Sequence, residues 1–273
     1  MRLLRASLRK LARRPASWVT LVLVIALNAL ILLALLAATR VAEDPQAALG
    51  ARVVFTFPGA YAILLGFVML FGPLFAVAYG GAVAGSEWGW GTLKAAVARG
   101  ESRTRYTLAT YAAVAIFTAI GLVLTYAATV LIAALMALLS DISLSGLTGL
   151  EDPAFLLEQF ARAIVALSMT AAFGFAIATV TRSQLAGIIV GVGLSFAEGI
   201  AGIFLPEVFK WFPFAAASAA TSGTGSGAFG GGGDGGPTIV QLDPNVALVA
   251  VVAWLAGALV VSALWTERAE ISG

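Results

Sequence analysis

Few side chains in this sequence could do chemistry, and six charged ones lie in one short stretch between long apolar segments. Between Ser86 and Tyr106 the sequence reads SEWGWGTLKAAVARGESRTRY, and a long apolar segment lies on either side of it. Charged residues make up only 11% of the chain. The charged side chains of this stretch are Glu87, Lys94, Arg99, Glu101, Arg103 and Arg105. A polar hairpin of this kind indicates a surface that contacts a polar partner.

Catalytic and metal-binding constellations are missing from the sequence. It contains no histidine, the commonest general base and metal ligand, and no cysteine. A membrane serine protease would need histidine, and a metalloprotease would need the H-E-x-x-H motif. The phosphate-binding motif G-x-x-x-x-G-K-[ST] is also absent. We therefore expect no enzyme activity, no metal and no cofactor on this chain.

The hydrophobicity of the chain determines its class. Hydrophobic residues make up 60% of the 273 residues, and the mean hydropathy is +0.99. A soluble domain of this size cannot hide so much apolar surface behind a polar exterior. The sequence therefore predicts an all-α, polytopic membrane protein that forms a single transmembrane domain over residues 1–273.

Six apolar segments are long enough to cross a bilayer, which takes about 20 helical residues. They are residues 17–39, 58–85, 107–139, 155–180, 185–205 and 246–265. We expect a short polar loop at residues 40–57. Residues 206–245 are expected to form a loop that holds a re-entrant piece, PEVFKWFPF, and a glycine-rich stretch at residues 223–236.

The first fourteen residues, MRLLRASLRKLARR, form a different kind of element. Leu4, Leu8 and Leu11 have helical spacing among basic side chains, which is typical of an amphipathic helix lying on anionic headgroups. The basic region of a signal peptide is the alternative. The apolar run that follows is far longer than the roughly 7–15 residues of the hydrophobic region of a signal peptide.

Basic residues predict the orientation of the spans, since cytoplasmic loops are enriched in lysine and arginine. Twelve of the sixteen basic residues fall on one side of the predicted membrane. They are Arg2, Arg5, Arg9, Lys10, Arg13, Arg14, Lys94, Arg99, Arg103, Arg105, Arg182 and Arg268. We therefore expect both termini and residues 86–106 in the cytoplasm, and residues 206–245 outside.

Within the polar stretch, Thr92 is positioned to cap a short helix that runs to about Arg99 and ends at Gly100. Ser102 can cap the third span. The apolar face of the short helix would contain Leu93, Ala96 and Val97. The alternative interpretation is an ordinary cytoplasmic loop, in which the basic residues reflect only the general enrichment of lysine and arginine on that side.

The order of residues in this stretch is familiar. Glu87 is followed by Gly-Thr-Leu-Lys at residues 91–94, by Gly100, and by Ser-Arg at residues 102–103. This pattern resembles the type-2 ATP-binding-cassette (ABC) exporter permeases of bacteria. The basic N-terminal helix, the Arg-Arg-Pro before the first span and the six spans match that family too. Family members often have proline where this chain has Gly100.

The resemblance implies a partner and a mechanism. In such permeases the first cytoplasmic loop is a coupling helix, which docks on a separate ATPase subunit that binds ATP and magnesium. Two permeases, identical or homologous, complete the transporter in the bacterial inner membrane, and no nucleic acid is involved. The implied ATPase contacts are Glu87, Gly91, Thr92, Leu93, Lys94, Arg99 and Arg103. The cargo would be a small amphipathic molecule, a lipid or a peptide.

Polar residues inside the predicted spans are the other candidates. Glu198 and Asn28 could line a substrate path, because polar groups at membrane depth are costly. The structural alternative for Asn28 is a bond to a neighbouring helix. For Glu198 the alternatives are that its side chain extends to the outer membrane interface or pairs with Lys210 or Arg162. Glu158 and Arg162 are spaced to pair on one helix face.

Two other functions remain open from the sequence. A secondary transporter driven by an ion gradient would show two related halves and buried acids near the midplane. No repeat relates residues 1–139 to residues 140–273, and Glu198 is the only acid well inside a span. A membrane anchor or scaffold without transport activity is the second alternative.

Overall fold

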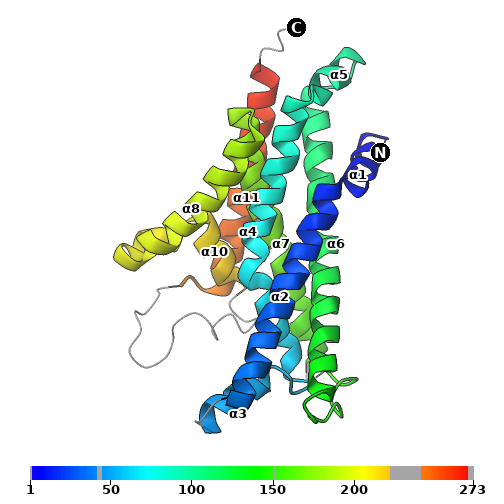
Figure 1. Cartoon of the computed structure of the whole chain (residues 1–273). Helices are drawn as coiled ribbons and strands as arrows, with labels where there is room; N and C mark the ends of the chain where they lie inside the picture. Colours follow the sequence, from blue (N-terminus) through cyan, green and yellow to red (C-terminus); the bar gives the residue numbers. More distant parts are fainter. Residues whose placement is uncertain (1, 42–44, 151, 222–240, 270–273) are drawn as a thin grey trace.

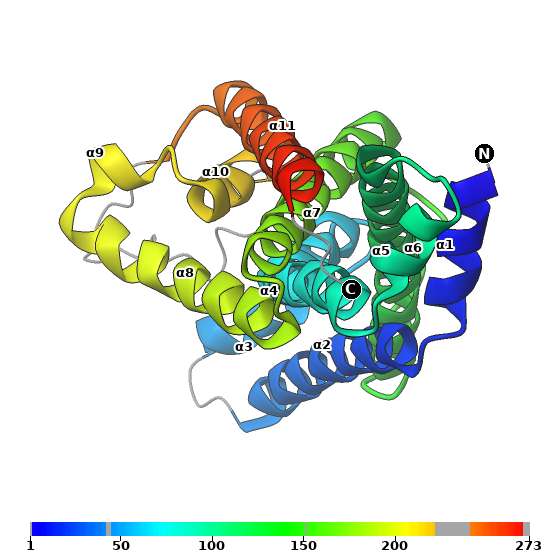
Figure 2. The ribbon, with the colours of Figure 1, turned by 90° about the horizontal axis from the view of Figure 1, so that it is seen from above.

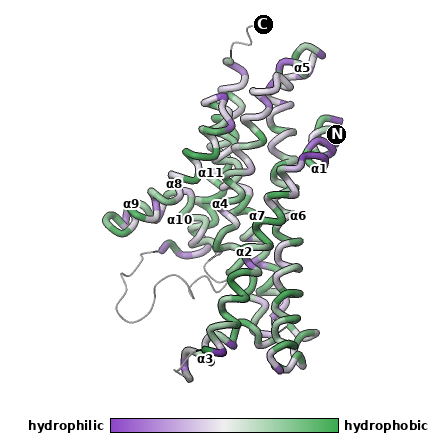
Figure 3. Tube along the Cα trace, viewed as in Figure 1, coloured by the Kyte–Doolittle hydropathy of each residue, from purple (hydrophilic) through white to green (hydrophobic). Residues whose placement is uncertain are grey.

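A computed structural model describes residues 2–41, 45–150, 152–221 and 241–269. These residues form helices and connecting turns, with no strand among them. Six helices are long and apolar enough to span a membrane, so the prediction of an all-α polytopic membrane protein is confirmed. They are α2 (Pro15–Val41), α4 (Ala60–Gly89), α6 (Arg103–Leu138), α7 (Pro153–Thr181), α8 (Gln184–Phe204) and α11 (Pro244–Arg268). Figure 1 shows them as an elongated bundle, and Figure 3 shows the hydrophobic residues running along it.

Helices α4 and α7 form the centre of the bundle, and the other long helices surround them (Figure 2). Glycines allow the central pair to approach closely. A Cβ atom on Gly80 would lie 2.0 Å from the carbonyl oxygen of Ala171, and one on Gly174 would lie 2.0 Å from that of Val77. Helix α8 packs against α4 in the same way, with Gly81 opposite Gly187. The sequence spaces Gly81 and Gly85, and likewise Gly187 and Gly191, four residues apart, which predicts close helix contacts, and this prediction is confirmed at these positions.

Helix α1 (Arg2–Ala12) is amphipathic, as expected, and its apolar face packs against the protein. Leu4, Leu8 and Leu11 pack into the protein core, and α1 lies against α6. With 36 residues, α6 is about 54 Å long at 1.5 Å per residue, whereas the hydrocarbon core is about 30 Å thick. Its projecting end gives the leucines a protein surface to cover. The basic residues Arg2, Arg5 and Arg9 are exposed.

The expected loop at residues 40–57 is wrong in part. Helix α3 (Pro45–Val53) lies within it, and proline is favoured at the first position of a helix. The residues that follow are not polar. Val54, Phe55 and Phe57 are buried in a second hydrophobic cluster with Leu32 of α2. This apolar cluster folds the segment back against the bundle.

The segment after α8 contains two short helices, α9 (Pro206–Phe209) and α10 (Pro213–Ala220). Helix α10 packs against α7, α8 and α11, so the chain turns back into the bundle, as a re-entrant piece would. Phe209 stacks on Phe212, with ring centroids 4.6 Å apart, at the turn between the two helices. The glycine-rich stretch at residues 223–236 lies outside the described residues.

Candidate functional site

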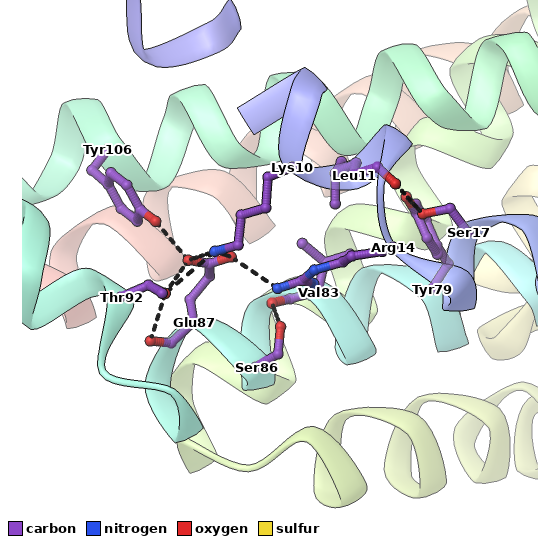
Figure 4. A network of polar contacts seen from close by, with 10 residues as sticks. All are labelled: Lys10, Leu11, Arg14, Ser17, Tyr79, Val83, Ser86, Glu87, Thr92 and Tyr106. Carbon is purple, nitrogen blue, oxygen red and sulfur yellow. Dashed lines mark hydrogen bonds and ion pairs between the residues drawn. The ribbon is translucent and has the colours of Figure 1, made fainter. Parts of the chain in front are cut away.

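Glu87 is at the centre of a buried polar network. The second span was expected to end at residue 85, but α4 continues to Gly89 and carries Glu87 in its last turn. The side chain of Glu87 is only 6% exposed. Figure 4 shows residues from three helices and one turn pointing at its carboxylate: Lys10 from α1, Thr92 from α5 (Thr92–Ala98), Tyr106 from α6 and Arg14 from the turn before α2.

Each oxygen of the Glu87 carboxylate has several partners. Lys10 Nζ lies 2.6 Å from Oε1 and 2.7 Å from Oε2. The Tyr106 hydroxyl donates to Oε2 at 2.6 Å, and the Thr92 hydroxyl lies within hydrogen-bond distance of the same oxygen. Arg14 Nη2 is 3.6 Å from Oε1 and completes an ion pair. Two cations and two hydroxyls therefore surround one carboxylate.

Because the Glu87 carboxylate is buried, its partners determine how the surrounding helices are arranged. Taking a carboxylate out of water costs several kcal/mol unless opposite charges and hydrogen bonds replace the water. The partners of Glu87 come from segments that are far apart in the chain, so its charge is compensated only when these segments meet. The network therefore fixes α1, α5 and the start of α6 relative to the end of α4.

Helix α5 stands between two residues with left-handed backbone conformations. Gly91 has φ of 65° and Gly100 has φ of 85°, a region that favours glycine. The expected end of the helix at Gly100 is thus close to the observed one at Ala98. The expected cap is wrong, because Gly91 occupies the N-cap and Thr92 is the first helical residue. The Thr92 hydroxyl donates a hydrogen bond to the Glu87 carboxylate instead. Ser102 caps α6, as expected, by accepting a hydrogen bond from the Arg105 amide.

The residues expected to contact a partner differ in their exposure. Leu93 and Ala96 are buried against the bundle, which confirms the apolar face of α5. Lys94 and Arg99 lie on the exposed side. Glu87 is buried and so does not present a surface contact in this structure. Gly91 and Thr92 are half-buried at the start of α5.

Arg103 joins α6 to the end of α11. Its Nη1 donates to the carbonyl oxygens of Glu267 at 3.0 Å and Ala269 at 2.8 Å. The Glu267 carboxylate in turn accepts a hydrogen bond from the Thr104 amide at 3.3 Å. Both ends of the described chain are therefore attached to the α4–α6 hairpin, α1 through Lys10 at Glu87 and α11 through Arg103.

Two aromatic contacts extend this assembly. The Arg14 guanidinium lies 4.6 Å from the centre of the Trp90 ring, and the Arg182 guanidinium lies 5.2 Å from that of Trp88. Arg182 is at the turn between α7 and α8, so α7 and α8 also contact the end of α4. Such cation–π pairs are worth about 0.5–1 kcal/mol at exposed sites and more when desolvated. The turn before α2 and the turn between α7 and α8 therefore both contact the end of α4.

Asn28 and Glu198, the two candidates inside the spans, make hydrogen bonds that the sequence did not predict. Asn28 donates to Val24 of its own helix at 2.9 Å, so the expected bond to a neighbouring helix is wrong. Its Oδ1 is buried with no hydrogen-bond partner among the described residues. Glu198 is 7% exposed and accepts from the amides of Phe214 at 2.9 Å and Ala215 at 3.2 Å. It therefore caps α10.

The partners suggested for Glu198 are engaged elsewhere. Lys210, at the C-terminal end of α9, pairs with Glu207 three residues earlier. Arg162 pairs with Glu158 at 2.7 Å, which confirms that expected pair, and it also donates to Asn245 at 2.6 Å. This second bond joins α7 to α11 at the end of the bundle opposite α5.

Sequence reasoning missed Lys10, Arg14 and Tyr106 as partners of Glu87. One signal was present, because Lys10 and Arg14 are four residues apart and basic, and the expected cytoplasmic side contains few acids. An acid placed among so many bases is expected to pair with some of them. The sequence did not say which ones.

Comparison with known proteins gives one family. Residues 51–241 match a family described as a protein of unknown function (DUF2705). This match covers more than half of the chain. The chain belongs to this family. The matched region contains Glu87, Thr92 and Tyr106, whereas Lys10 and Arg14 precede it. No curated protein is significantly similar to the chain.

Proposed function

We propose that this chain is the permease subunit of an ATP-driven exporter in the bacterial inner membrane, with α5 as its coupling helix. Six apolar helices supply the membrane domain. The observation that carries the proposal is the position of α5, a short helix at the tip of the α4–α6 hairpin. The buried Glu87 network holds it in place at its junctions with α4 and α6. Both termini and α5 are cytoplasmic in this proposal.

A helix that transmits force must be rigid on one side and accessible on the other. Helix α5 meets both requirements, because Leu93 and Ala96 are buried while Lys94 and Arg99 are exposed. We infer that Lys94 and Arg99 contact an ATP-binding-cassette ATPase on another polypeptide. Glu87, Thr92 and Arg103 act as positioning residues, since their partners lie within this chain. ATP and magnesium are bound by the ATPase.

A second permease, identical or homologous, would complete the transporter, and the cargo would be a small amphipathic molecule, a lipid or a peptide. The membrane-anchor and ion-gradient alternatives differ from this proposal in one respect: neither requires an ATPase. Co-expression of the chain with an ATPase encoded beside it therefore separates the functions. We expect the two to co-purify and to show substrate-stimulated ATP hydrolysis.

Charge reversal of Arg99 tests the contact directly. Arg99→Glu should weaken co-purification with the ATPase while the permease stays folded. Arg52→Glu is the matched control, because Arg52 is an exposed arginine at the end of α3, away from α5. A normal complex with normal stimulated hydrolysis in the Arg99→Glu variant would contradict the assignment.

A further inference from the structure

A groove runs along the outside of the bundle between α2, α4 and α6. Its volume is about 120 Å³, and its walls are formed mainly by apolar side chains. They include Leu21, Val24, Val68, Phe75, Phe117 and Leu122. The rim is open to the surroundings, since Trp18 is 54% exposed and Ile120 is 48% exposed. The Glu87 network does not account for this groove.

The surroundings of the groove determine what can fill it. Its walls belong to membrane-spanning helices, so the medium outside is hydrocarbon. A buried water needs two to four polar partners, and the polar atoms of the groove are hydroxyls at its edges, such as those of Ser17 and Tyr79. These two hydroxyls are already hydrogen-bonded to each other at 2.9 Å. The groove therefore favours a hydrocarbon chain.

The shape of the groove fits one chain. The lining residues of α2 run from Ser17 to Val24, which is about 10 Å along the helix at 1.5 Å per residue. Its volume is slightly below the roughly 150 Å³ of an apolar cavity known to accept benzene. This space accommodates a segment of a single alkyl chain.

One end of the groove meets the basic bend between α1 and α2. The Trp18 indole, on the rim, donates to the carbonyl oxygen of Ala12 at 2.9 Å, which fixes the rim beside this bend. Arg13 follows directly and is exposed, and Arg9 is exposed one turn earlier. Arg14, in contrast, is engaged by Glu87 and Trp90. A guanidinium group matches the oxygens of a phosphate well.

We propose that this groove binds one acyl chain of an anionic phospholipid, whose headgroup phosphate lies beside Arg9 and Arg13. The apolar walls favour an acyl chain, and the two arginines favour a negatively charged headgroup. One lipid would bind per chain, in the leaflet that faces α1. This site does not depend on the proposed ATPase partner, so it can be tested on the purified chain alone.

Gly121 offers a way to close the groove. It lies in the wall formed by α6, and a Cβ atom built on it meets nothing within 4 Å. The position therefore has room for a Cβ atom, and a leucine there would extend into the groove. Gly193 on α8 is a matched control, because a Cβ there also meets nothing within 4 Å and Gly193 does not line the groove.

The experiment uses the full chain in lipid nanodiscs with a phosphatidylglycerol probe that carries a photoreactive diazirine in one acyl chain. We expect mass spectrometry to map the crosslinks to residues 17–24 and 117–125. Gly121→Leu should reduce these crosslinks to background, whereas Gly193→Leu should leave them unchanged. Labelling of the groove that survives Gly121→Leu would overturn the proposal.

Headgroup selection is tested with a phosphatidylcholine probe of the same acyl chain. The native chain should be labelled more by the anionic probe than by the phosphatidylcholine probe. In the double variant Arg9→Gln/Arg13→Gln, the ratio of the two labelling yields should fall by about fivefold for each arginine removed. Equal labelling of the native chain by the two probes would overturn the assignment of an anionic lipid. This comparison remains informative even where the Gly121→Leu variant does not fold.

Discussion

Lys10 and Glu87 are 77 positions apart in the chain, yet the Lys10 ammonium contacts both oxygens of the Glu87 carboxylate, at 2.6 Å and 2.7 Å. This contact joins the N-terminal helix to the last turn of α4, directly below α5. Because Thr92 and Tyr106 bind the same carboxylate, the position of α5 depends on α1. A movement of α5 should therefore also move α1 and the ends of α4 and α6 that bind Glu87.

Removing the charge of Glu87 should destabilise the protein. Glu87→Gln keeps the size of the side chain but leaves Lys10 and Arg14 without a buried anion. Breaking a fully buried pair costs about 3–5 kcal/mol, and we expect about 2 kcal/mol here because the Lys10 side chain is 29% exposed. The apparent melting temperature in detergent measures the change.

Glu158→Gln is the matched control for this variant. Glu158 also forms an ion pair, with Arg162, but its side chain is 57% exposed. Exposed pairs contribute about 0–1 kcal/mol, so the melting temperature should hardly change. Equal shifts in the two variants would show that the Glu87 network is no stronger than a surface ion pair.

The backbone at Gly91 should be required for α5. With φ of 65°, Gly91 adopts a conformation that costs other residues about 1–2 kcal/mol. We expect Gly91→Ala to speed hydrogen exchange of the α5 amides. Gly89→Ala is the control, because a Cβ at either position meets nothing within 4 Å and only Gly91 has positive φ. Identical exchange in both variants would rule out a backbone effect.

Close packing of α4 on α7 should not tolerate a methyl group at Gly80. A Cβ there would lie 2.0 Å from the carbonyl oxygen of Ala171, so the helices would have to separate. Overpacking costs about 1–3 kcal/mol, and a backbone obstacle belongs at the upper end of that range. Gly80→Ala should lower the melting temperature and the yield of folded protein. Gly199→Ala, with open space around it, should not.

Glu198 should hold α10 through an acceptor oxygen. Glu198→Leu removes the acceptor and leaves the amides of Phe214 and Ala215 unpaired, so their hydrogen exchange should accelerate. Glu198→Gln keeps one acceptor oxygen and should protect these amides better. Glu207→Leu is the control, since the Glu207 side chain is 70% exposed. Unchanged exchange after Glu198→Leu would show that the cap is dispensable.

The sequence predicted the features that local patterns encode. Apolar length predicted the six spans, residues three and four apart predicted the buried face of α5, and Ser102 was identified as the cap of α6. The glycines spaced four apart in α4 and α8 predicted close helix contacts. Each of these signals lies within one helix or one turn, where spacing determines which residues share a face.

Features that depend on distant partners could not be predicted. Leu4 and Leu8 have the spacing of a membrane-surface helix, but that spacing does not reveal that they pack against the core beside α6, which is distant in the sequence. Glu198 reads as a buried acid that needs a cation, but its partners are two backbone amides of α10. Backbone partners have no sequence signature, because every residue except proline carries the same amide.

Crosslinking from α5 is the most direct test of the proposed coupling helix. The chain contains no cysteine, so Arg99→Cys introduces a single thiol on the exposed side of α5. Leu139→Cys, 75% exposed at the other end of α6, provides the matched control. Each variant is co-expressed with the ATPase encoded beside the chain and treated with a thiol-to-amine crosslinker in inside-out vesicles. We expect Arg99→Cys to crosslink to the ATPase and Leu139→Cys not to. Absence of a crosslink from Arg99→Cys, or labelling of its thiol from outside intact cells, would contradict the proposed coupling role of α5.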